Sequence, residues 1–317
     1  MKHLFLINPA AGKRGSTDAL CRQIVDTFTA LGLAYEIFLA AAPRDCEARA
    51  RAAAESGEPV RLYACGGDGT LNEAVNGAAG YDNAAVTNVP KGTGNDFIKL
   101  FGPTYRSAFS DLAALAAGPQ SAFDLMDCNG RLGIDVCCAG VDARIAADVH
   151  KYKSIPLLNG MAAYSLSLIV NVLFKGLSRP TRILAGDTVL DGESTIICIC
   201  NGRHYGGGFT PVGDAQPDDG ILDMLVVPKV GRLTFFRLLG AYAKGRYREH
   251  PEVLAHFHGQ SFAFSSPQEL TAVVDGEVIH AKDFHVSLSP KKVWFFYPAG
   301  LNYHATAITS GTQPVPL

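Results

Sequence analysis

Strand-like and helical patterns alternate along the first 125 residues, and this alternation constrains the fold of the chain more than any other feature. Strands that alternate with helices form a parallel sheet with helices on both of its faces. The strand-like segments are 3–8, 34–39, 60–65 and 85–89, and the helical segments are 18–31, 44–56 and 71–79. We therefore predict a Rossmann-like, parallel α/β domain over residues 1–125.

From about residue 126 the pattern changes to short β-type runs that are separated by turn residues. Such a pattern is typical of an antiparallel sandwich or barrel. Helical segments near 160–175 and 231–248 interrupt it. We predict a second domain, an antiparallel β-sandwich carrying a few helices, over residues 126–297. Residues 298–317 are candidates for rejoining the first domain.

Composition and charge are those of an ordinary globular protein, with 48% hydrophobic and 18% charged residues. A net charge of −2 offers no electrostatic argument for nucleic-acid binding. The eight cysteines lie in or beside apolar runs, without a CxxC pair or zinc spacing, which favours reduced thiols in a cytosol. The N-terminal apolar run of four residues is too short for the core of a signal peptide.

The strongest functional signal is the sequence Gly-Gly-Asp-Gly-Thr at positions 66–70, directly after the third strand-like segment. Ligands of parallel sheets bind at the carboxyl ends of the strands. Three glycines in four residues are conformationally costly unless the backbone must approach a ligand or adopt positive φ. Asp68 lies among them, where it could hold the magnesium-bound phosphate that phosphoryl transfer requires. The alternative is a tight turn in which Asp68 caps the next helix.

Two further loops follow strand-like segments. Residues 8–13 are small and precede a helix, so their amides could favour a phosphate. They lack the Walker A pattern, and a plain turn explains them equally well. Residues 90–97 supply the Thr93 hydroxyl and, near the start of the next helix, Asp96. The three loops together predict a phosphate-binding edge of the sheet.

Six glycine-rich or acidic stretches run in order along the chain. They are INPAAGKRG (7–15), GGDGTLNEAVNG (66–77), PKGTGNDF (90–97), CAGVDARIA (138–146), NGRHYGGGFTPVGDAQPDDGILD (201–223) and VDGEV (274–278). Jointly they resemble the bacterial soluble diacylglycerol kinase family, which includes related lipid kinases and the catalytic domains of sphingosine kinases. The resemblance implies transfer of the γ-phosphoryl group of ATP, with Mg²⁺, to a lipid hydroxyl, foremost that of diacylglycerol to give phosphatidic acid. It places nucleotide binding on Asn8, Pro9, Ala10, Gly12, Lys13, Gly66, Gly67, Asp68, Gly69, Thr70, Asn72, Glu73, Thr93, Asn95, Asp96 and Asp124.

The turn Asp275-Gly276-Glu277 is the main acidic motif of the second domain. On its own, Asp-Gly between two β-type runs is an ordinary hairpin turn. The resemblance places the catalytic acids on Asp275 and Glu277, and a hydroxyl nucleophile needs such a base within hydrogen-bond reach. The sequence leaves open which of the two accepts the proton.

The acidic stretch 216–223 reads as a surface turn on its residues alone. The resemblance implies a structural Mg²⁺ site here, formed by the Asp219 carboxylate and by backbone oxygens near Gln216 and Ile221. Oxygen ligands suit this ion. Its implied role is to fix the second domain near the cleft.

Asp124 lies at the end of the first domain. The resemblance joins it with Asp68 and Asp96 in an acidic network around the magnesium of the nucleotide, whereas an aspartate at a strand end is the simpler explanation. The family often has a threonine after the second strand that touches the nucleotide. Residues 39–44 read LAAAPR and offer no hydroxyl, so that contact is not expected here.

Segment 229–248 is a candidate for contact with a membrane surface, which a lipid kinase must reach to bind its substrate. It holds six Lys or Arg residues and no acid, interleaved with apolar residues, a pattern that can rest on anionic lipid. The alternative is a helix packed on the second sheet with its charges in solvent. The 21 uncharged residues 154–174 include Pro156 and several polar side chains, so we expect a half-buried helix there, not a membrane span.

We expect a cytoplasmic protein that binds its lipid substrate transiently at the inner face of the membrane. We expect no nucleic-acid partner, and the sequence leaves open whether the protein forms a homodimer. Two other functions also stay open. NAD kinases share the motif at 66–70, although residues 8–13, 90–97 and 274–278 fit lipid kinases better. The other is a non-catalytic nucleotide-binding regulator, although all acidic site positions are present.

Overall fold

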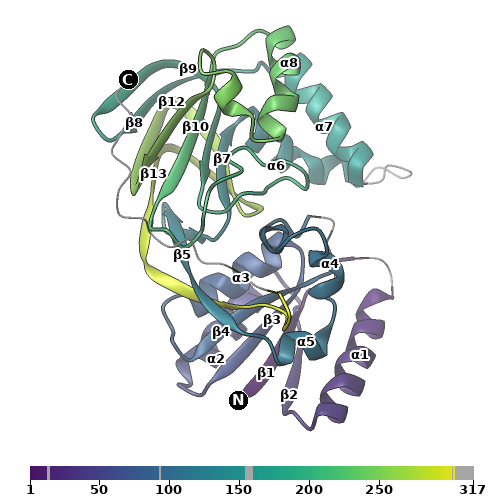
Figure 1. The fold of residues 1–317 in the computed structure, drawn as a ribbon. Helices are drawn as coiled ribbons and strands as arrows, with labels where there is room; N and C mark the ends of the chain where they lie inside the picture. The colour runs from purple at the N-terminus through teal and green to yellow at the C-terminus, as the bar shows by residue number, and fades with distance from the viewer. Residues whose placement is uncertain (13–14, 93, 154–159, 302, 304–317) are drawn as a thin grey trace.

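The computed structural model describes residues 1–12, 15–92, 94–153, 160–301 and 303. Figure 1 shows two domains, with the N-terminal domain below and the C-terminal domain above. No helix within these described residues is both long and apolar enough to cross a membrane.

The N-terminal domain is built on a parallel sheet. Its neighbouring strands lie in the order β4-β3-β1-β2. The elements are β1 (Lys2–Ile7), α1 (Ser16–Leu31), β2 (Tyr35–Leu39), α2 (Asp45–Glu55), β3 (Val60–Gly66), α3 (Asp68–Ala78) and β4 (Ala84–Pro90), then the 3-10 helix η1 (Phe97–Phe101), α4 (Tyr105–Ala108), α5 (Leu112–Ala116) and β5 (Gln120–Cys128). The strand–helix alternation predicted from the sequence is confirmed.

Aromatic side chains fill the core of this domain. Tyr63 of β3 stacks on Phe5 of β1 with ring centroids 4.2 Å apart, and Phe28 of α1 meets Phe5 edge-on at 4.9 Å. All three residues are fully buried. Removing a buried ring of this kind costs roughly 3–5 kcal/mol. The packing therefore holds β1 and β3 in place, and with them the loops at their carboxyl ends.

The C-terminal domain is largely antiparallel. Its elements are β6 (Arg131–Gly133), β7 (Val136–Gly140), α6 (Val141–Lys153), α7 (Gly160–Phe174), β8 (Arg179–Ala185), β9 (Thr188–Cys200), β10 (Leu222–Pro228), α8 (Arg232–Ala243), the 3-10 helix η2 (Tyr247–Glu249), β11 (Ala255–Gly259), β12 (Ser261–Val274) and β13 (Glu277–Phe296). The strands follow the order β11-β10-β9-β7-β12-β13. The predicted antiparallel β domain with a few helices is confirmed.

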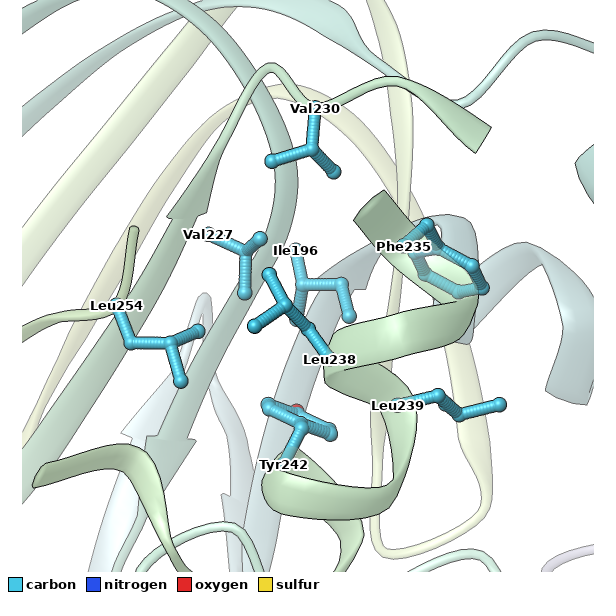
Figure 2. Close-up of a pocket in the computed structure, with 8 residues that line it drawn as sticks. All are labelled: Ile196, Val227, Val230, Phe235, Leu238, Leu239, Tyr242 and Leu254. Atoms are coloured by element: carbon cyan, nitrogen blue, oxygen red, sulfur yellow. The ribbon is translucent and has the colours of Figure 1, made fainter. Parts of the chain in front are cut away.

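Helix α8 covers one face of this sheet. Figure 2 shows an apolar pocket between α8 and strands β9 and β10, lined by Ile196, Val227, Val230, Phe235, Leu238, Leu239, Tyr242 and Leu254. Phe235, Leu238 and Tyr242 are buried, whereas Leu233 is 88% exposed. The helix expected near 231–248 therefore packs on the sheet through one side and leaves the other side to solvent.

The described part of the uncharged segment 154–174 is the helix α7. Residues 154–159 lie outside the described residues, and α7 follows them. In the second half of α7, Ser167 and Asn171 are buried, while Ile169 and Phe174 are exposed. This half of the helix is therefore half-buried, as expected.

Strands β5 and β13 run from one domain into the other. The first part of β13 pairs with β12, whereas Trp294 and Phe295 pair in parallel with Ala85 and Val86 of β4. β5 lies antiparallel to β13 on both sides of this transition. The chain thus already returns to the sheet of the first domain inside β13, at Trp294 and Phe295. A strand pattern that continues across the boundary carries no signal of the change of domain.

The residues after β13 stay with the N-terminal domain as far as they are described. The backbone N–H of Ala299 donates to the carbonyl of Ala114 at 2.9 Å, and Leu301 and Tyr303 pack against the N-terminal core. Residues 304–317, which belong to the same prediction, lie outside the described residues.

Candidate active site

The loops after β3 and β4 meet at the carboxyl edge of the N-terminal sheet. The carbonyl oxygen of Gly66 accepts hydrogen bonds from the backbone N–H groups of Lys91 and Gly92 at 3.0 and 3.1 Å. A Cβ atom on Gly92 would lie 2.7 Å from the Cα of Gly67, so this approach requires glycine. The structure thus brings the predicted loops 66–70 and 90–97 into direct contact.

Asp68 begins α3 and joins these two loops. Its carboxylate accepts hydrogen bonds from the backbone N–H groups of Asn95 at 3.0 Å and Asp96 at 2.5 Å. The N-cap of α3 is Gly67, and α3 has no side-chain cap, so Asp68 does not serve as the cap of its own helix. Burial, reinforced by the nearby Asp96 carboxylate, raises the pKa of Asp68 to about 6. A cation bound here would offset that unfavourable charge.

Asp96 connects its loop to the C-terminal domain. Its Oδ2 accepts a hydrogen bond from the backbone N–H of Gly207 at 2.9 Å, and its Oδ1 pairs with the ammonium of Lys99. Asn95 has a φ of 53° and donates from Nδ2 to the carbonyl of Gly66 at 2.8 Å. The amide of Asn95 therefore supports the loop backbone, while Asp96 links the loop to the other domain.

The loop after β1 lies beside the other two. Asn8 donates from Nδ2 to the hydroxyl of Thr70 at 3.3 Å. Gly12 has a φ of 86°, and a Cβ atom there would lie 3.2 Å from the carbonyl oxygen of Lys91. The other residues predicted in these loops are Pro9 and Ala10, which are exposed, and Lys13 and Thr93, which lie outside the described residues.

Asp275 lies in the turn between β12 and β13 with a φ of 47°. Its carboxylate accepts hydrogen bonds from the backbone N–H groups of Ile134, Asp135 and Val136 at 2.6, 3.2 and 2.9 Å. Asn72 adds a further bond from Nδ2 at 3.3 Å. Burial raises the pKa of Asp275, and these bonds to the charged form oppose that rise. Both carboxylate oxygens are therefore engaged within the protein.

Glu277 lies across the same turn and faces the 66–70 loop. A Cβ atom on Gly69 would lie 3.4 Å from Oε1 of Glu277, and one on Gly276 would lie 3.7 Å from the backbone nitrogen of Gly69. Within the part of the chain that the structure describes, the Glu277 carboxylate has no hydrogen bond or ion pair. It is a half-buried carboxylate, free to meet a ligand, beside the glycine-rich loop.

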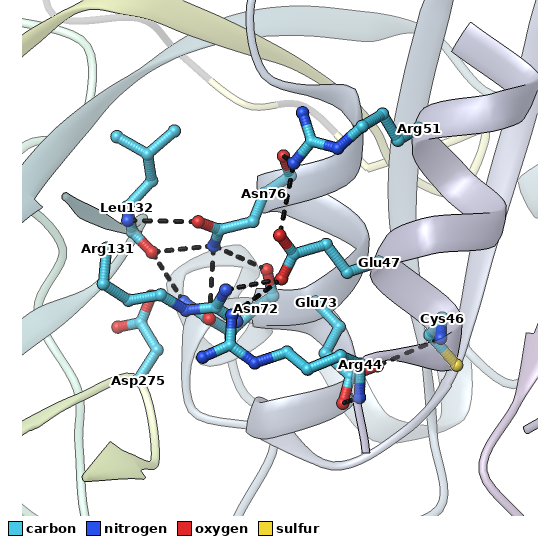
Figure 3. A network of polar contacts seen from close by, with 10 residues as sticks. All are labelled: Arg44, Cys46, Glu47, Arg51, Asn72, Glu73, Asn76, Arg131, Leu132 and Asp275. Atoms are coloured by element: carbon cyan, nitrogen blue, oxygen red, sulfur yellow. Dashed lines mark hydrogen bonds and ion pairs between the residues drawn. The ribbon is translucent and has the colours of Figure 1, made fainter. Parts of the chain in front are cut away.

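Two predicted nucleotide-binding residues of α3 make hydrogen bonds within the protein. Figure 3 shows Asn72 directed toward Asp275, whereas Glu73 is directed toward the start of α2. The Glu73 carboxylate accepts hydrogen bonds from the backbone N–H groups of Arg44 and Cys46, both at 3.1 Å. Glu73 thus satisfies the first amides of α2 and does not point into the loops, because successive helix residues are directed about 100° apart. Asn72 positions Asp275.

The same α2–α3 region is anchored by an ion pair that the sequence analysis did not anticipate. Arg131 of β6 pairs with Glu47 at 2.5 Å, and Glu47 also bonds Arg51 at 3.2 Å (Figure 3). Arg131 is buried, so loss of Glu47 would leave the Arg131 charge uncompensated. The pair fixes β6 against α2, which packs on the helix α3 that carries Asn72.

Asp135 is a buried acid of the site that the sequence analysis missed. Its Oδ1 accepts a weak hydrogen bond from the backbone N–H of His204 at 3.3 Å, and its Oδ2 is buried without a partner among the described residues. Burial, followed by the charges of Asp275, Asp96 and Asp68, raises the pKa of Asp135 well above its usual range. The only signal in the sequence was an aspartate inside an apolar run.

Four acidic side chains therefore lie close together where the two domains meet: Asp68, Asp96, Asp135 and Asp275. The donor set is made of carboxylate oxygens, one of them unpartnered, and it faces loops rich in backbone amides. Hard cations such as Mg²⁺ prefer oxygen ligands of this kind. The residues fit a magnesium–phosphate group.

Asp124 lies against the loop 216–221 instead of joining the two acids expected beside it. Its backbone N–H donates to the carbonyl of Pro217 at 2.7 Å, and its Oδ2 accepts a hydrogen bond from Gly220 at 2.9 Å. Its Oδ1 pairs with Lys292 at 2.8 Å, because Asp124 and Lys292 are opposite each other in the β5–β13 ladder. Strand register thus directs Asp124 to the second predicted metal site.

At that second site, Asp219 lies in the loop between Gln216 and Ile221. Its Oδ1 accepts a hydrogen bond from the backbone N–H of Ile221 at 3.0 Å. Burial, together with the charges of Asp223 and Asp124, raises the pKa of Asp219 to about 6. Acids held this close favour a bound cation, so the loop fits a structural Mg²⁺ in which Asp219 and the backbone oxygens of Gln216 and Ile221 are the candidate ligands.

Known proteins share this architecture. Residues 2–128 match the diacylglycerol kinase catalytic domain, and residues 135–296 match the YegS C-terminal NAD kinase beta sandwich-like domain. A Pseudomonas aeruginosa protein named "Probable lipid kinase YegS-like" is 31% identical over 251 residues, which cover 75% of this chain and 77% of that protein. A diacylglycerol kinase of Bacillus anthracis has a similar fold, with a TM-score of 0.69 and 20% identity over 95% of this chain and 98% of that chain. The chain therefore belongs to the lipid kinases that join a diacylglycerol kinase catalytic domain to a YegS C-terminal domain, a family of phosphotransferases.

Proposed function

We propose that this lipid kinase transfers the γ-phosphoryl group of ATP, with Mg²⁺, to the hydroxyl of diacylglycerol and releases phosphatidic acid. The observation that carries the proposal is the seating of the 275–277 turn on the 66–70 loop, where Glu277 approaches Gly69. A phosphate-binding loop and a carboxylate able to accept a proton then face one space. Phosphoryl transfer to an alcohol needs both.

The three N-terminal loops are the proposed site of the nucleotide phosphates. Gly67 and Gly69 leave backbone amides free of side chains at the carboxyl end of β3. Such amides, together with the N-terminus of α3, favour phosphate charge. Asp68 and Asp96 would hold the Mg²⁺ ion, which supplies charge neutralisation at the phosphates when bound.

Glu277 is the proposed group that takes the proton of the acceptor hydroxyl. Its carboxylate is free of internal bonds in the described part of the chain, whereas Asp275 accepts three backbone N–H groups and the amide of Asn72. A carboxylate so engaged is suited to orient the turn. Proton transfer to Glu277 would come late, because phosphoryl transfer passes through a loose transition state and needs little activation of the alcohol.

A kinase assay with several acceptors tests this proposal. The purified protein receives γ-labelled ATP and Mg²⁺ with diacylglycerol, phosphatidylglycerol, a sphingoid base or NAD, and products are separated and identified by mass. We expect label in phosphatidic acid. Label in another lipid would keep the kinase and change its substrate, label in NAD alone would favour an NAD kinase, and ATP binding without any product would favour a regulator.

The outer side of α7 and α8 is the proposed membrane contact. Phe174 is 78% exposed, Leu233 is 88% exposed and Phe236 is 45% exposed. Arg232 ties the two helices together by donating to the carbonyls of Val172 and Leu173, each at 3.0 Å. Exposed apolar side chains on joined helices, with cations around them, suit the surface of an anionic bilayer.

The cations of segment 229–248 differ in how available they are for contact with a lipid surface. Arg248 pairs with Asp214 at 2.6 Å, and Lys229 pairs with Glu193. Arg237 and Lys244 are exposed and, among the described residues, have no acidic partner. These two are therefore the residues to test for attraction to anionic lipid.

We expect the double variant Arg237→Glu/Lys244→Glu to bind vesicles of phosphatidylcholine and phosphatidylglycerol at least about tenfold more weakly than the wild type, since each basic residue near such a surface contributes about 1 kcal/mol. Co-sedimentation at low and high salt measures the effect, and salt should weaken the wild type in the same direction. The charge reversal Lys282→Glu, at an exposed site on β13, is the matched control. Equal binding by the double variant and the wild type would remove this membrane contact.

A further inference from the structure

Strand β11 forms the edge of the sheet in the described structure and pairs only with β10. It carries His256 and His258, two residues apart, so both imidazoles project from the same face. In the antiparallel register, Asp223 of β10 lies directly opposite His258, and Leu225 lies opposite His256. Asp223 is therefore the cross-strand neighbour of one histidine and the diagonal neighbour of the other.

The three side chains converge on one point. His256 Nε2 and His258 Nδ1 each lie 2.9 Å from the same oxygen, Oδ1 of Asp223. The two imidazole rings are 4.3 Å apart between centroids, at an angle of 74°. One ligand atom from each residue falls within 4.8 Å of the others. Three potential metal ligands are thus already gathered, without a change in backbone.

The surroundings leave one side of this group open. The side chains of Asp223 and His256 are 10% and 14% exposed, whereas that of His258 is 63% exposed. The ring of Tyr247 packs on His256 at 4.6 Å between centroids and holds it in place. A metal bound here would have three fixed protein ligands and a fourth position that water can fill.

The chemistry of the three ligands selects the kind of ion. Two imidazole nitrogens with one carboxylate oxygen suit Zn²⁺ and related transition metals, whereas Mg²⁺ prefers oxygen ligands alone. Around a tetrahedral Zn²⁺ with bonds of about 2.0–2.1 Å, neighbouring ligand atoms lie roughly 3.3 Å apart. The two separations between Oδ1 of Asp223 and the histidine nitrogens, 2.9 Å each, need to widen by only a few tenths of an ångström, and the two nitrogens lie within 4.8 Å of each other.

We propose that Asp223, His256 and His258 form a Zn²⁺ site that cross-links the edge strand β11 to its neighbour β10. His256 would bind through Nε2 and His258 through Nδ1, with the ring proton on the other nitrogen of each. The site is distinct from the oxygen-lined loop 216–221, and it does not depend on the identity of the lipid acceptor. Its expected effect is to stabilise the sheet edge, because an ion that binds only the folded chain raises the temperature of unfolding.

Zinc titration of the intact protein tests the site. The protein is freed of metal with a chelator, then titrated with Zn²⁺ against a chromophoric zinc indicator. We expect one tight site per chain, with no competition from millimolar Mg²⁺. Substitution with Co²⁺ should give visible absorption bands typical of a tetrahedral nitrogen–oxygen site.

His258→Gln is the most informative variant, because the side chain is mostly exposed and its loss should leave the fold intact. We expect it to weaken Zn²⁺ binding by at least about 100-fold, since even groups outside the ligand shell change metal affinity by roughly 10–100-fold. Asp223→Asn should weaken it similarly. His280→Gln, an exposed histidine paired with Thr271 elsewhere in the sheet, is the matched control and should bind Zn²⁺ as the wild type does.

Thermal unfolding with and without Zn²⁺ separates metal binding from folding. Zn²⁺ should raise the unfolding temperature of the wild type and of His280→Gln, and leave that of His258→Gln unchanged. Without Zn²⁺, the wild type and His258→Gln should unfold alike. Absence of a stoichiometric zinc site in the wild type, or unaltered zinc affinity in both His258→Gln and Asp223→Asn, would overturn the proposal.

Discussion

An Asp68→Ala protein is expected to lose lipid phosphorylation by at least about 100-fold, the scale on which loss of one preorganised electrostatic group slows an enzyme. Asp68 has two roles that alanine cannot fill. Its carboxylate holds the amides of Asn95 and Asp96, which ties two loops together, and it faces the proposed magnesium–phosphate site. Steady-state rates with ATP and diacylglycerol measure the loss.

A second variant separates these two roles of Asp68. Asp68→Asn keeps the shape and one acceptor oxygen for the two backbone N–H groups but removes the charge, so the loops should stay closer to their native position than in Asp68→Ala. We expect it to remain folded by circular dichroism and still to phosphorylate lipid poorly. Glu55→Gln, an exposed acid on α2, is the charge-matched control and should keep the wild-type rate. Near-normal rates in both Asp68 variants would end the assignment of this loop to the nucleotide.

The second large effect is expected at the 275–277 turn, where the two acids should differ in kind. Glu277→Gln removes a carboxylate without internal bonds, so it should lower kcat by about 10²–10⁴-fold and leave stability near the wild-type value. Asp275→Asn should lower both activity and stability. Its NH₂ group would meet backbone N–H donors, and each unsatisfied buried group costs roughly 1–3 kcal/mol.

Urea unfolding of both variants, beside their kinetics, checks this division. The proposed roles require a stable, inactive Glu277→Gln and a destabilised Asp275→Asn. Val278→Thr, at an exposed position of the same strand, controls for disturbance of the turn. If Glu277→Gln retains its kcat while a folded Asp275→Asn has none, the proton acceptor is Asp275, and the engaged carboxylate must release its partners during the reaction.

Local patterns were enough to predict the parallel sheet and its loops. Strands of period two alternate with helices of period 3.6, and a chain with that pattern can bury its apolar surface in few ways. The carboxyl ends of adjacent parallel strands lie on one edge, so the meeting of Gly66 with Lys91 and Gly92 follows from the pattern. The type of fold and the family were predicted from the sequence and are confirmed.

Side-chain direction was harder to predict, even within one helix. Asn72 and Glu73 are adjacent in a motif that suggested nucleotide contact for both. Their rotation around α3 turns Asn72 toward Asp275 and Glu73 toward the amides at the start of α2. Asp124 shows the same limit in a strand, because its partner Lys292 is set by the register of β5 with β13. A sequence motif identifies residues that lie near one another, but it does not give the direction of each side chain.

The alternating α/β core, the antiparallel second domain and the glycine-rich loop 66–70 can be predicted from local patterns, because each depends on periodicity and on conformations that glycine permits. Other features emerge only in the folded chain: Glu277 faces Gly69, Asp135 joins the acidic group, and His256 and His258 contact Asp223. These contacts join residues far apart in the chain. They depend on strand register and on the crossing of β5 and β13 between domains, and no short stretch of sequence encodes either.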